Sequence, residues 1–216
     1  MAKITLPIAG GFYQSPSLAI SNQRCVNLYP NIAQTQTPYA ESLLGTAGLS
    51  LLATTGQIKQ VNRGAWVKSG VPYFVNGKAL YKLNRSVVDG VESFSVVELG
   101  SITVEGRCLF ADNGKQLLIL NDSGDGWIYD ETAVTPFQQI TDTNFTTTNG
   151  KPVSVVFIDS FFVVSTDEKK IKKSAANDGL TWPPLDFSGA EADPDDIVGL
   201  NVFRNQLYAL GSETIE

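Results

Sequence analysis

Four apolar segments recur along the second part of the sequence at nearly constant spacing, and this repeat constrains the fold more than any other feature. They are centred on Tyr73, Leu117, Phe161 and Leu207, so the successive spacings are 44, 44 and 46 residues. Four strands of five or six residues, with their turns, need about 45 residues, which is the length of one β-propeller blade. The sequence therefore predicts an all-β propeller of four-stranded blades.

Each repeat is predicted to begin with a β-hairpin, because each central segment follows another apolar run across a short turn. The four pairs are "GAWV" with "KSGVPY", "RCLFA" with "DNGKQLL", "VVFI" with "DSFF", and "LNVF" with "RNQLY". In the second pair, Asn113 and Gly114 favour a type I′ turn, which needs positive φ at both central positions. Further strands are predicted in "ALYKLN", "SFSVVELG", "GWIYDE", "PFQQITD" and "KKIKKSA".

The repeat divides the sequence into two regions of different composition, one before the repeats and one that contains them. Residues 1–58 are rich in small and polar residues and are expected to run extended, contributing an edge strand or subunit contacts. Residues 59–216 hold three blades and part of a fourth. Because a ring of about four blades is the usual minimum, and open edges leave strands unpaired, we expect an incomplete ring. The chain is therefore interpreted as the N-terminal part of a longer one, or as completed by a partner.

The segment "NDGLTWPP" resembles an Asp-box, a hairpin found between the third and fourth strands of propeller blades. Its matching residues are Asn177, Gly179, Thr181 and Trp182. We expect the Asn177 side chain to bond neighbouring backbone N–H groups, Gly179 to adopt positive φ, and the indole to pack under the turn. This is a structural device, and Trp66 and Trp127 are likewise expected in the core.

Composition restricts the chemistry available to the chain. The net charge is -6, which argues against tight binding to a phosphate backbone. There is no histidine, so Ser-His-Asp, Cys-His and His-ligated metal sites are excluded in this chain. No apolar run approaches the roughly 20 residues of a membrane span. Cys25 and Cys108 are expected to be buried thiols, and neither a cofactor nor an enzymatic activity is predicted.

Acidic residues gathered in "EADPDD" raise two alternatives. Glu191, Asp193 and Asp195 alternate as calcium ligands do, but the bend glycine and distal glutamate of an EF-hand are missing. Paired carboxylates beside an Asp-box also suggest a sialidase-like or carbohydrate-binding propeller acting on host polysaccharide. Sialidases bind the substrate carboxylate with clustered arginines, whereas the five arginines here are dispersed along the sequence.

Three blocks together resemble the packaged-DNA stabilisation proteins of short-tailed bacteriophages, also called tail accessory factors, hubs or nozzles. The blocks are "GGFYQSPSLAISNQRCVNLYP" with "GTAGLSLL", "TWPPLDFSGAEADPDDIVGL", and "NQLYALGSETIE". The resemblance implies a structural protein of the virion tail that assembles in the host cytoplasm below the portal and adaptor. There it would extend the DNA channel and help to retain packaged DNA.

The resemblance also implies partners. These are the portal and adaptor ring proteins, tailspike or tail needle proteins, and copies of the chain itself in a hexameric ring. Double-stranded DNA is expected to pass without specific binding, and no membrane is involved. Candidate subunit contacts are Phe12, Tyr13, Tyr29 and Tyr39 in the N-terminal segment. The alternative is that these rings cover their own propeller.

Overall fold

The protein is represented by a computed structural model that describes residues 26–32, 41–57, 60–189 and 196–215. The chain divides into two compact units, Met1–Leu51 and Leu52–Glu216, whereas the sequence predicts a boundary near residue 58. In the first unit, β1 (Leu28–Ile32) pairs antiparallel with β2 (Glu41–Gly45). The second unit holds the remaining described strands, which form four antiparallel sheets.

The second unit contains three four-stranded sheets and one two-stranded sheet, numbered here in chain order. Sheet 1 is β3 (Asn62–Lys68), β4 (Val71–Asn76), β5 (Ala79–Val88) and β6 (Val91–Ser101). Sheet 2 is β7 (Cys108–Asp112), β8 (Leu117–Asn121), β9 (Gly126–Tyr129) and β10 (Phe137–Gln139). Sheet 3 is β11 (Pro152–Ile158), β12 (Phe161–Thr166), β13 (Lys170–Lys173) and β14 (Phe187–Gly189). Sheet 4 is β15 (Ile197–Phe203) and β16 (Gln206–Gly211).

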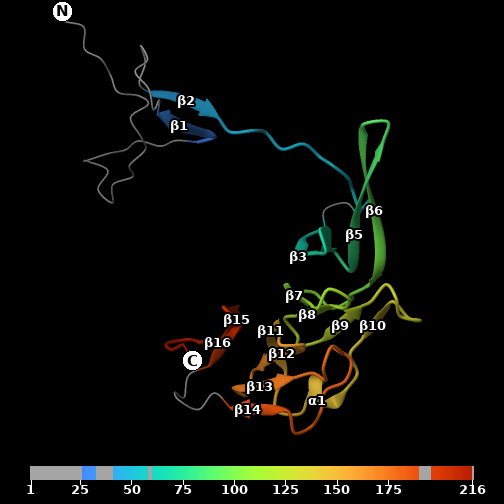
Figure 1. Cartoon of the computed structure of the whole chain (residues 1–216), viewed down its shortest axis with the longest axis vertical. Coiled ribbons are helices and arrows are strands. Elements are labelled where there is room, and N and C mark those ends of the chain that lie inside the picture. Colours follow the sequence, from blue (N-terminus) through green and yellow to red (C-terminus); the bar gives the residue numbers. More distant parts are fainter. Residues whose placement is uncertain (1–25, 33–40, 58–59, 190–195, 216) are drawn as a thin grey trace, which may run out of the picture. The chain divides into compact units, whose positions relative to one another are not determined.

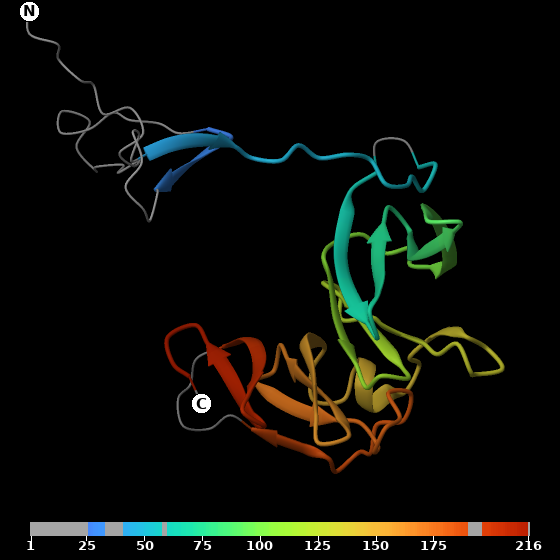
Figure 2. The same cartoon turned by 45° about the horizontal axis from the view of Figure 1, so that its top comes forward.

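The sheets follow one another as propeller blades do (Figures 1 and 2). Each begins with a hairpin, and their first strands are neighbours in order, β3 with β7, β7 with β11 and β11 with β15. Each sheet therefore has a leading face, turned toward the sheet before it in sequence, and a trailing face, turned toward the sheet after it. The prediction of an all-β propeller is confirmed, and the described sheets do not close into a ring.

Apolar side chains fill the three seams between consecutive sheets. The first seam lies between sheets 1 and 2, the second between sheets 2 and 3, and the third between sheets 3 and 4. In β8, Leu117 and Ile119 point into the first seam, while Leu118 and Leu120 point into the second. All four are completely buried, because successive side chains of a strand point to opposite faces and both faces of sheet 2 are covered. This explains the unbroken apolar run "LLIL". Burying one such side chain stabilises the fold by about 1.5–3 kcal/mol.

Type I′ turns close three of the four leading hairpins. Ser69 and Gly70, Asp159 and Ser160, and Arg204 and Asn205 all have positive φ, between 48° and 79°. These pairs join β3 to β4, β11 to β12, and β15 to β16 without splaying the strands.

The turn between β7 and β8 in sheet 2 differs from the type I′ turn that the sequence predicts. Gly114 has φ of 85°, but Asn113 does not have positive φ. Instead, Asn113 Oδ1 accepts hydrogen bonds from the N–H groups of Lys115 and Gln116, at 3.0 and 2.6 Å. Local side-chain bonding of this kind competes with regular turns, and here it produces a four-residue loop.

The two outer strands of sheet 1 are longer than the sequence predicts. Strands β5 and β6 pair from Ala79 and Ser101 out to the turn between Val88 and Val91, so they continue beyond β4 as a two-stranded ribbon. Figure 1 shows this ribbon projecting from the sheet. A short helix, α1 (Thr143–Thr146), follows sheet 2 and is N-capped by Asp142, whose side chain accepts a hydrogen bond from the Asn144 N–H.

Candidate functional site

The Asp-box-like segment lies between β13 and β14, and its tryptophan is at the centre of the second seam. Trp182 is 2% exposed and its ring lies 4.8 Å from that of Phe145. Its indole N–H donates to the carbonyl oxygen of Gly179 at 2.9 Å, and its backbone N–H donates to Asp142 Oδ2 at 2.9 Å. Thr181 accepts a backbone hydrogen bond from Ala175, which closes the loop.

Two details of this hairpin differ from the prediction. Positive φ occurs at Asn177, at 55°, and not at Gly179. The side chain that bonds the turn is that of Asp178, whose Oδ1 accepts from the Leu180 N–H at 3.0 Å. Gly179 is needed for a different reason, because a Cβ there would lie 2.5 Å from Ile128 Cδ1 of sheet 2. The hairpin is therefore fixed by packing across the seam as well as by its own turn.

We expect Gly179→Ala to lower the free energy of unfolding by about 2 kcal/mol, because the added methyl group overpacks the second seam. Urea denaturation followed by circular dichroism measures this change. Gly199→Ala is the matched control, since no heavy atom lies within 4 Å of the Cβ position there. Equal effects of the two substitutions would contradict the packing role of Gly179.

Arg63 is a buried cation near the start of the first seam, with 9% of its surface exposed. Its Nε donates to the carbonyl of Gly106 at 2.6 Å, and one terminal nitrogen donates to Gly77 and Ile102 at 3.0 and 3.1 Å. The other terminal nitrogen donates to the Val104 carbonyl. The guanidinium thus ties β3 to the β4–β5 turn and to the segment that connects sheets 1 and 2.

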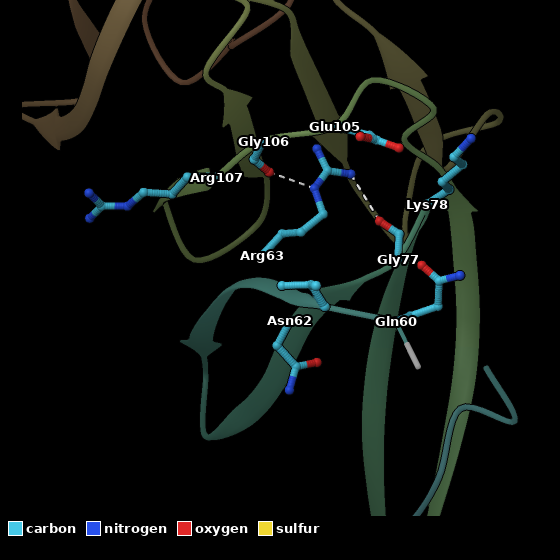
Figure 3. A pocket seen from close by; sticks show the side chains of 9 residues that line it. Gln60, Asn62, Arg63, Gly77, Lys78, Glu105, Gly106 and Arg107 are labelled. Atoms are coloured by element: carbon cyan, nitrogen blue, oxygen red, sulfur yellow. Dashed lines mark hydrogen bonds between the residues drawn. The ribbon is translucent and has the colours of Figure 1, made fainter. Parts of the chain in front are cut away.

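A cavity of about 520 Å³ opens beside Arg63 and is lined also by Lys78, Glu105 and Arg107. Figure 3 shows the side chains of Lys78 and Arg107 directed away from the guanidinium, which is bonded to the carbonyls of Gly77 and Gly106. The charges of the lining therefore do not converge on one point. The hydrogen bonds of Arg63 stabilise the surrounding backbone, and the lining does not form an anion-binding site.

Lys172 is a second buried cation, 4% exposed, on β13. Its Nζ donates to the carbonyl oxygens of Phe145, Thr148 and Gly150 at 2.8, 2.9 and 2.8 Å. Three carbonyls match the three donors of an ammonium group. Burial lowers the pKa of Lys172 to about 8, although nearby carboxylates partly oppose the shift.

This pKa predicts how stability depends on pH. Because the folded value of about 8 lies below the ordinary 10.5, the unfolded chain binds more protons between these values, and stability rises with pH in that window. From pH 8 to 10, we expect the free energy of unfolding to rise by about 2 kcal/mol relative to Lys172→Met, which lacks the titrating group. Urea denaturation of both proteins across this range measures the difference. A constant or falling difference would contradict the assignment.

A polar cluster joins sheets 1 and 2 in the first seam. Glu131 Oε1 accepts from Lys82 Nζ at 2.5 Å and from the hydroxyls of Tyr73 and Tyr129, both at 3.2 Å. The bond from Lys82 lowers the pKa of Glu131, and burial beside this carboxylate raises the pKa of Tyr129 to about 12. The Lys68 ammonium lies over both tyrosine rings, at 5.6 and 5.5 Å from their centroids. None of these residues lines the cavity of Figure 3, and their contacts hold the two sheets together.

Other residues singled out from the sequence have mixed outcomes. Trp127 is buried, but the prediction that Trp66 belongs to the core is wrong, since it is 39% exposed and its indole N–H donates to Asp112 Oδ2 at 2.5 Å. Cys108 is a buried free thiol. Tyr29 lies on β1 and is 47% exposed. The remaining predicted positions lie outside the described residues: Phe12, Tyr13, Cys25, Tyr39, Glu191, Asp193 and Asp195.

Within the described residues, no three or more acidic or cysteine side chains gather as a metal site would require. Nor does any helix of the described part have the length and apolar character to cross a membrane. The buried cations Arg63 and Lys172 were missed by sequence reasoning. No sequence signal distinguishes Lys172 from the neighbouring lysines in "KKIKKS", and its acceptors are backbone carbonyls that a sequence does not reveal.

Two solved structures of very different sequence have a similar fold. BamB from Moraxella catarrhalis superposes with a TM-score of 0.50 at 10% identity, covering 73% of this chain and 44% of BamB. The computationally designed protein Ika4 gives a TM-score of 0.53 at 10% identity, covering 78% of this chain and 97% of Ika4. At these identities the likeness concerns the fold alone. This chain thus spans less than half the length of BamB.

No curated protein matches the chain in sequence. Residues 4–216 do match the family Phage_stabilise, described as bacteriophage P22 Gp10, beta-propeller. The family match covers nearly the whole chain, and the propeller in its description agrees with the sheets and seams of the second unit. The chain therefore belongs to this family of phage stabilisation proteins with a β-propeller fold.

Proposed function

We propose that the chain is a structural component of a phage tail that assembles below the portal and adaptor, extends the DNA channel and helps to retain packaged DNA. The observation that carries this proposal is the family match over residues 4–216. The propeller of consecutive packed sheets supports it as a rigid building block. Its proposed neighbours are the portal and adaptor rings, tailspike or tail needle proteins, and further copies of the chain in a hexameric ring.

The first strands of the four sheets carry no exposed cation, so they would not bind a duplex tightly if they faced the channel. On the first strands β3, β7, β11 and β15, the cations Arg63 and Lys68 are buried, and Asp112 is the one acid in their sequences. Affinity for a duplex grows with each phosphate that an exposed cation neutralises, so these strands offer little electrostatic attraction. The net charge of -6 acts in the same direction. Retention would then depend on closing the channel, without tight binding of the duplex.

A retention assay tests this function. Phage heads packed with DNA in the absence of this protein should lose their DNA to added nuclease, and addition of the purified protein should restore protection. Nuclease-resistant DNA per head is the measured quantity. An unrelated propeller of similar size and charge serves as the control. Heads that keep their DNA equally well without the protein, or that remain unprotected after it binds, would contradict the proposal.

A further inference from the structure

Strand β6 is the outermost strand of sheet 1, and its outer edge is unpaired in the described part of the chain. It pairs with β5 and with no other described strand (Figure 1). It also differs from the outermost strands of the other four-stranded sheets, because β10 and β14 have three residues each, whereas β6 has eleven. Very short outer strands protect a sheet edge from pairing with other chains, and β6 lacks this protection.

Other features that protect sheet edges are also missing from most of β6. The strand contains neither proline nor lysine. Its pairing with β5 shifts register only between Leu80 and Tyr81, so the strand is regular from Val91 to Glu98. Alternate residues of an outer strand direct their N–H and C=O groups away from the sheet. The edge from Val91 to Glu98 therefore presents a row of backbone donors and acceptors with which a further strand can pair.

The side chains of β6 specify which kind of strand fits beside it. Successive residues point to opposite faces, so on one face the exposed Glu92 and Glu98 flank the half-buried Phe94 and Val96. These glutamates are the only charged residues of the strand. Opposite charges on neighbouring strands stabilise a sheet, and like charges destabilise it. A complementary strand therefore has two apolar residues between two cations at alternate positions. The other face of β6 has two serines between two valines: Val91, Ser93, Ser95 and Val97.

Strand β5 has an unpaired edge as well, but its charge is different. Its pairing with β4 extends from Ala79 to Lys82, so only the part from Leu83 to Val88 is unpaired on that side. The one charged residue of this part is Arg85, which forms an ion pair with Glu92 across the ribbon. Arg85 repels an incoming strand that carries cations, whereas the glutamates of β6 attract it. Charge therefore favours the β6 edge.

We propose that the outer edge of β6 binds an extended segment of another protein as an added β-strand. Main-chain hydrogen bonds supply the affinity in this mode of recognition, and alternate side chains supply the selectivity. The segment recognised has apolar residues at alternate positions between two cations. The proposal does not depend on the proposed function, because the edge and its charges belong to sheet 1 alone.

Hydrogen exchange measured by mass spectrometry tests this binding mode. The probe is a peptide of about seven residues with blocked ends, in which valine and threonine alternate between two terminal lysines. Bound peptide should slow exchange at the amides of residues 91–98, and it should leave β10 and β14 unchanged. Protection of residues 83–88 in place of 91–98, or no protection at any peptide concentration, would overturn the proposal.

Matched peptides and variants test the selectivity for charge. A peptide with terminal glutamates should bind about tenfold more weakly, because like charges then meet on neighbouring strands. Glu98→Gln should weaken binding of the lysine peptide about threefold, and it keeps an oxygen that can accept from the Tyr81 hydroxyl. Glu105→Gln, which removes an exposed acid outside β6, should have no effect. Equal binding of both peptides, or equal effects of both substitutions, would contradict the proposal.

A methylated peptide distinguishes strand addition from binding through side chains alone. N-methylation of its valine and threonine amides keeps every side chain but removes the backbone donors, so it should abolish protection of residues 91–98. Equal protection by the methylated peptide would rule out strand addition. Sedimentation and hydrogen exchange without peptide test the other possible occupant of the edge. A stable dimer in which residues 91–98 are already protected would assign the edge to a second copy and refute the proposal.

Discussion

Trp182→Ala is expected to lower the free energy of unfolding by about 4 kcal/mol, one of the two largest effects of any substitution considered for this chain. The indole is 2% exposed, and it contacts Phe145 within the cluster that joins sheets 2 and 3. Truncation therefore leaves a cavity in the seam. It also removes the bond from the indole N–H to the Gly179 carbonyl. Urea denaturation followed by far-ultraviolet circular dichroism measures the loss.

Trp66→Ala is the matched control for this experiment, because Trp66 lies on β3 and is 39% exposed. Its truncation should cost much less, about 1 kcal/mol. Trp182→Phe should fall between the two, since a phenyl ring fills part of the site but cannot donate to Gly179. The packing account would be contradicted if Trp182→Ala and Trp66→Ala destabilised the chain equally.

Arg63→Met is expected to cost about 3 kcal/mol of stability, because it leaves buried carbonyl oxygens without a donor. The guanidinium bonds four of them, at Gly77, Ile102, Val104 and Gly106. Methionine keeps an unbranched apolar stem like that of arginine but has no N–H group, so the substitution removes the guanidinium together with its hydrogen bonds. The same denaturation experiment provides the measurement.

Arg107→Met provides the comparison, since Arg107 is exposed and borders the same cavity. It should change stability by less than about 0.5 kcal/mol, as surface substitutions usually do. Arg63→Lys should recover only part of the loss, because an ammonium group has three donors in a geometry unlike that of the guanidinium fork. If Arg63→Met behaved like Arg107→Met, the bonds to the four carbonyls would not contribute to folding.

The sheets could be predicted because their signals are local and repeated. A strand buried on both faces, such as β8 with its run Leu117–Asn121, stands out as a continuous apolar segment, and the 45-residue period places its equivalents in the other sheets. The hairpins follow, because each second strand is preceded by a short polar turn. The extension of β5 and β6 beyond the blade was missed, since neither strand has a break where β4 ends.

The polar contacts could not be predicted, because their partners come from distant backbone. Arg63 and Lys172 bond carbonyls whose positions depend on the packing of whole sheets. The turn at Asn113 differs from its prediction because a side-chain oxygen bonds two local N–H groups. Gly179 was assigned to a turn geometry, whereas its role is to allow close approach of Ile128 across the seam. Sequence patterns thus identify which strand faces are buried, but the contacts that those faces make can be seen only in the folded structure.

Electron cryomicroscopy of the phage tail vertex tests the central claim most directly. The account predicts copies of this propeller arranged around the DNA channel immediately below the adaptor, with sheets 1 to 4 fitting the density in their observed order. Virions in which the tail vertex has no density for these sheets, or in which the protein lies elsewhere in the particle, would contradict it.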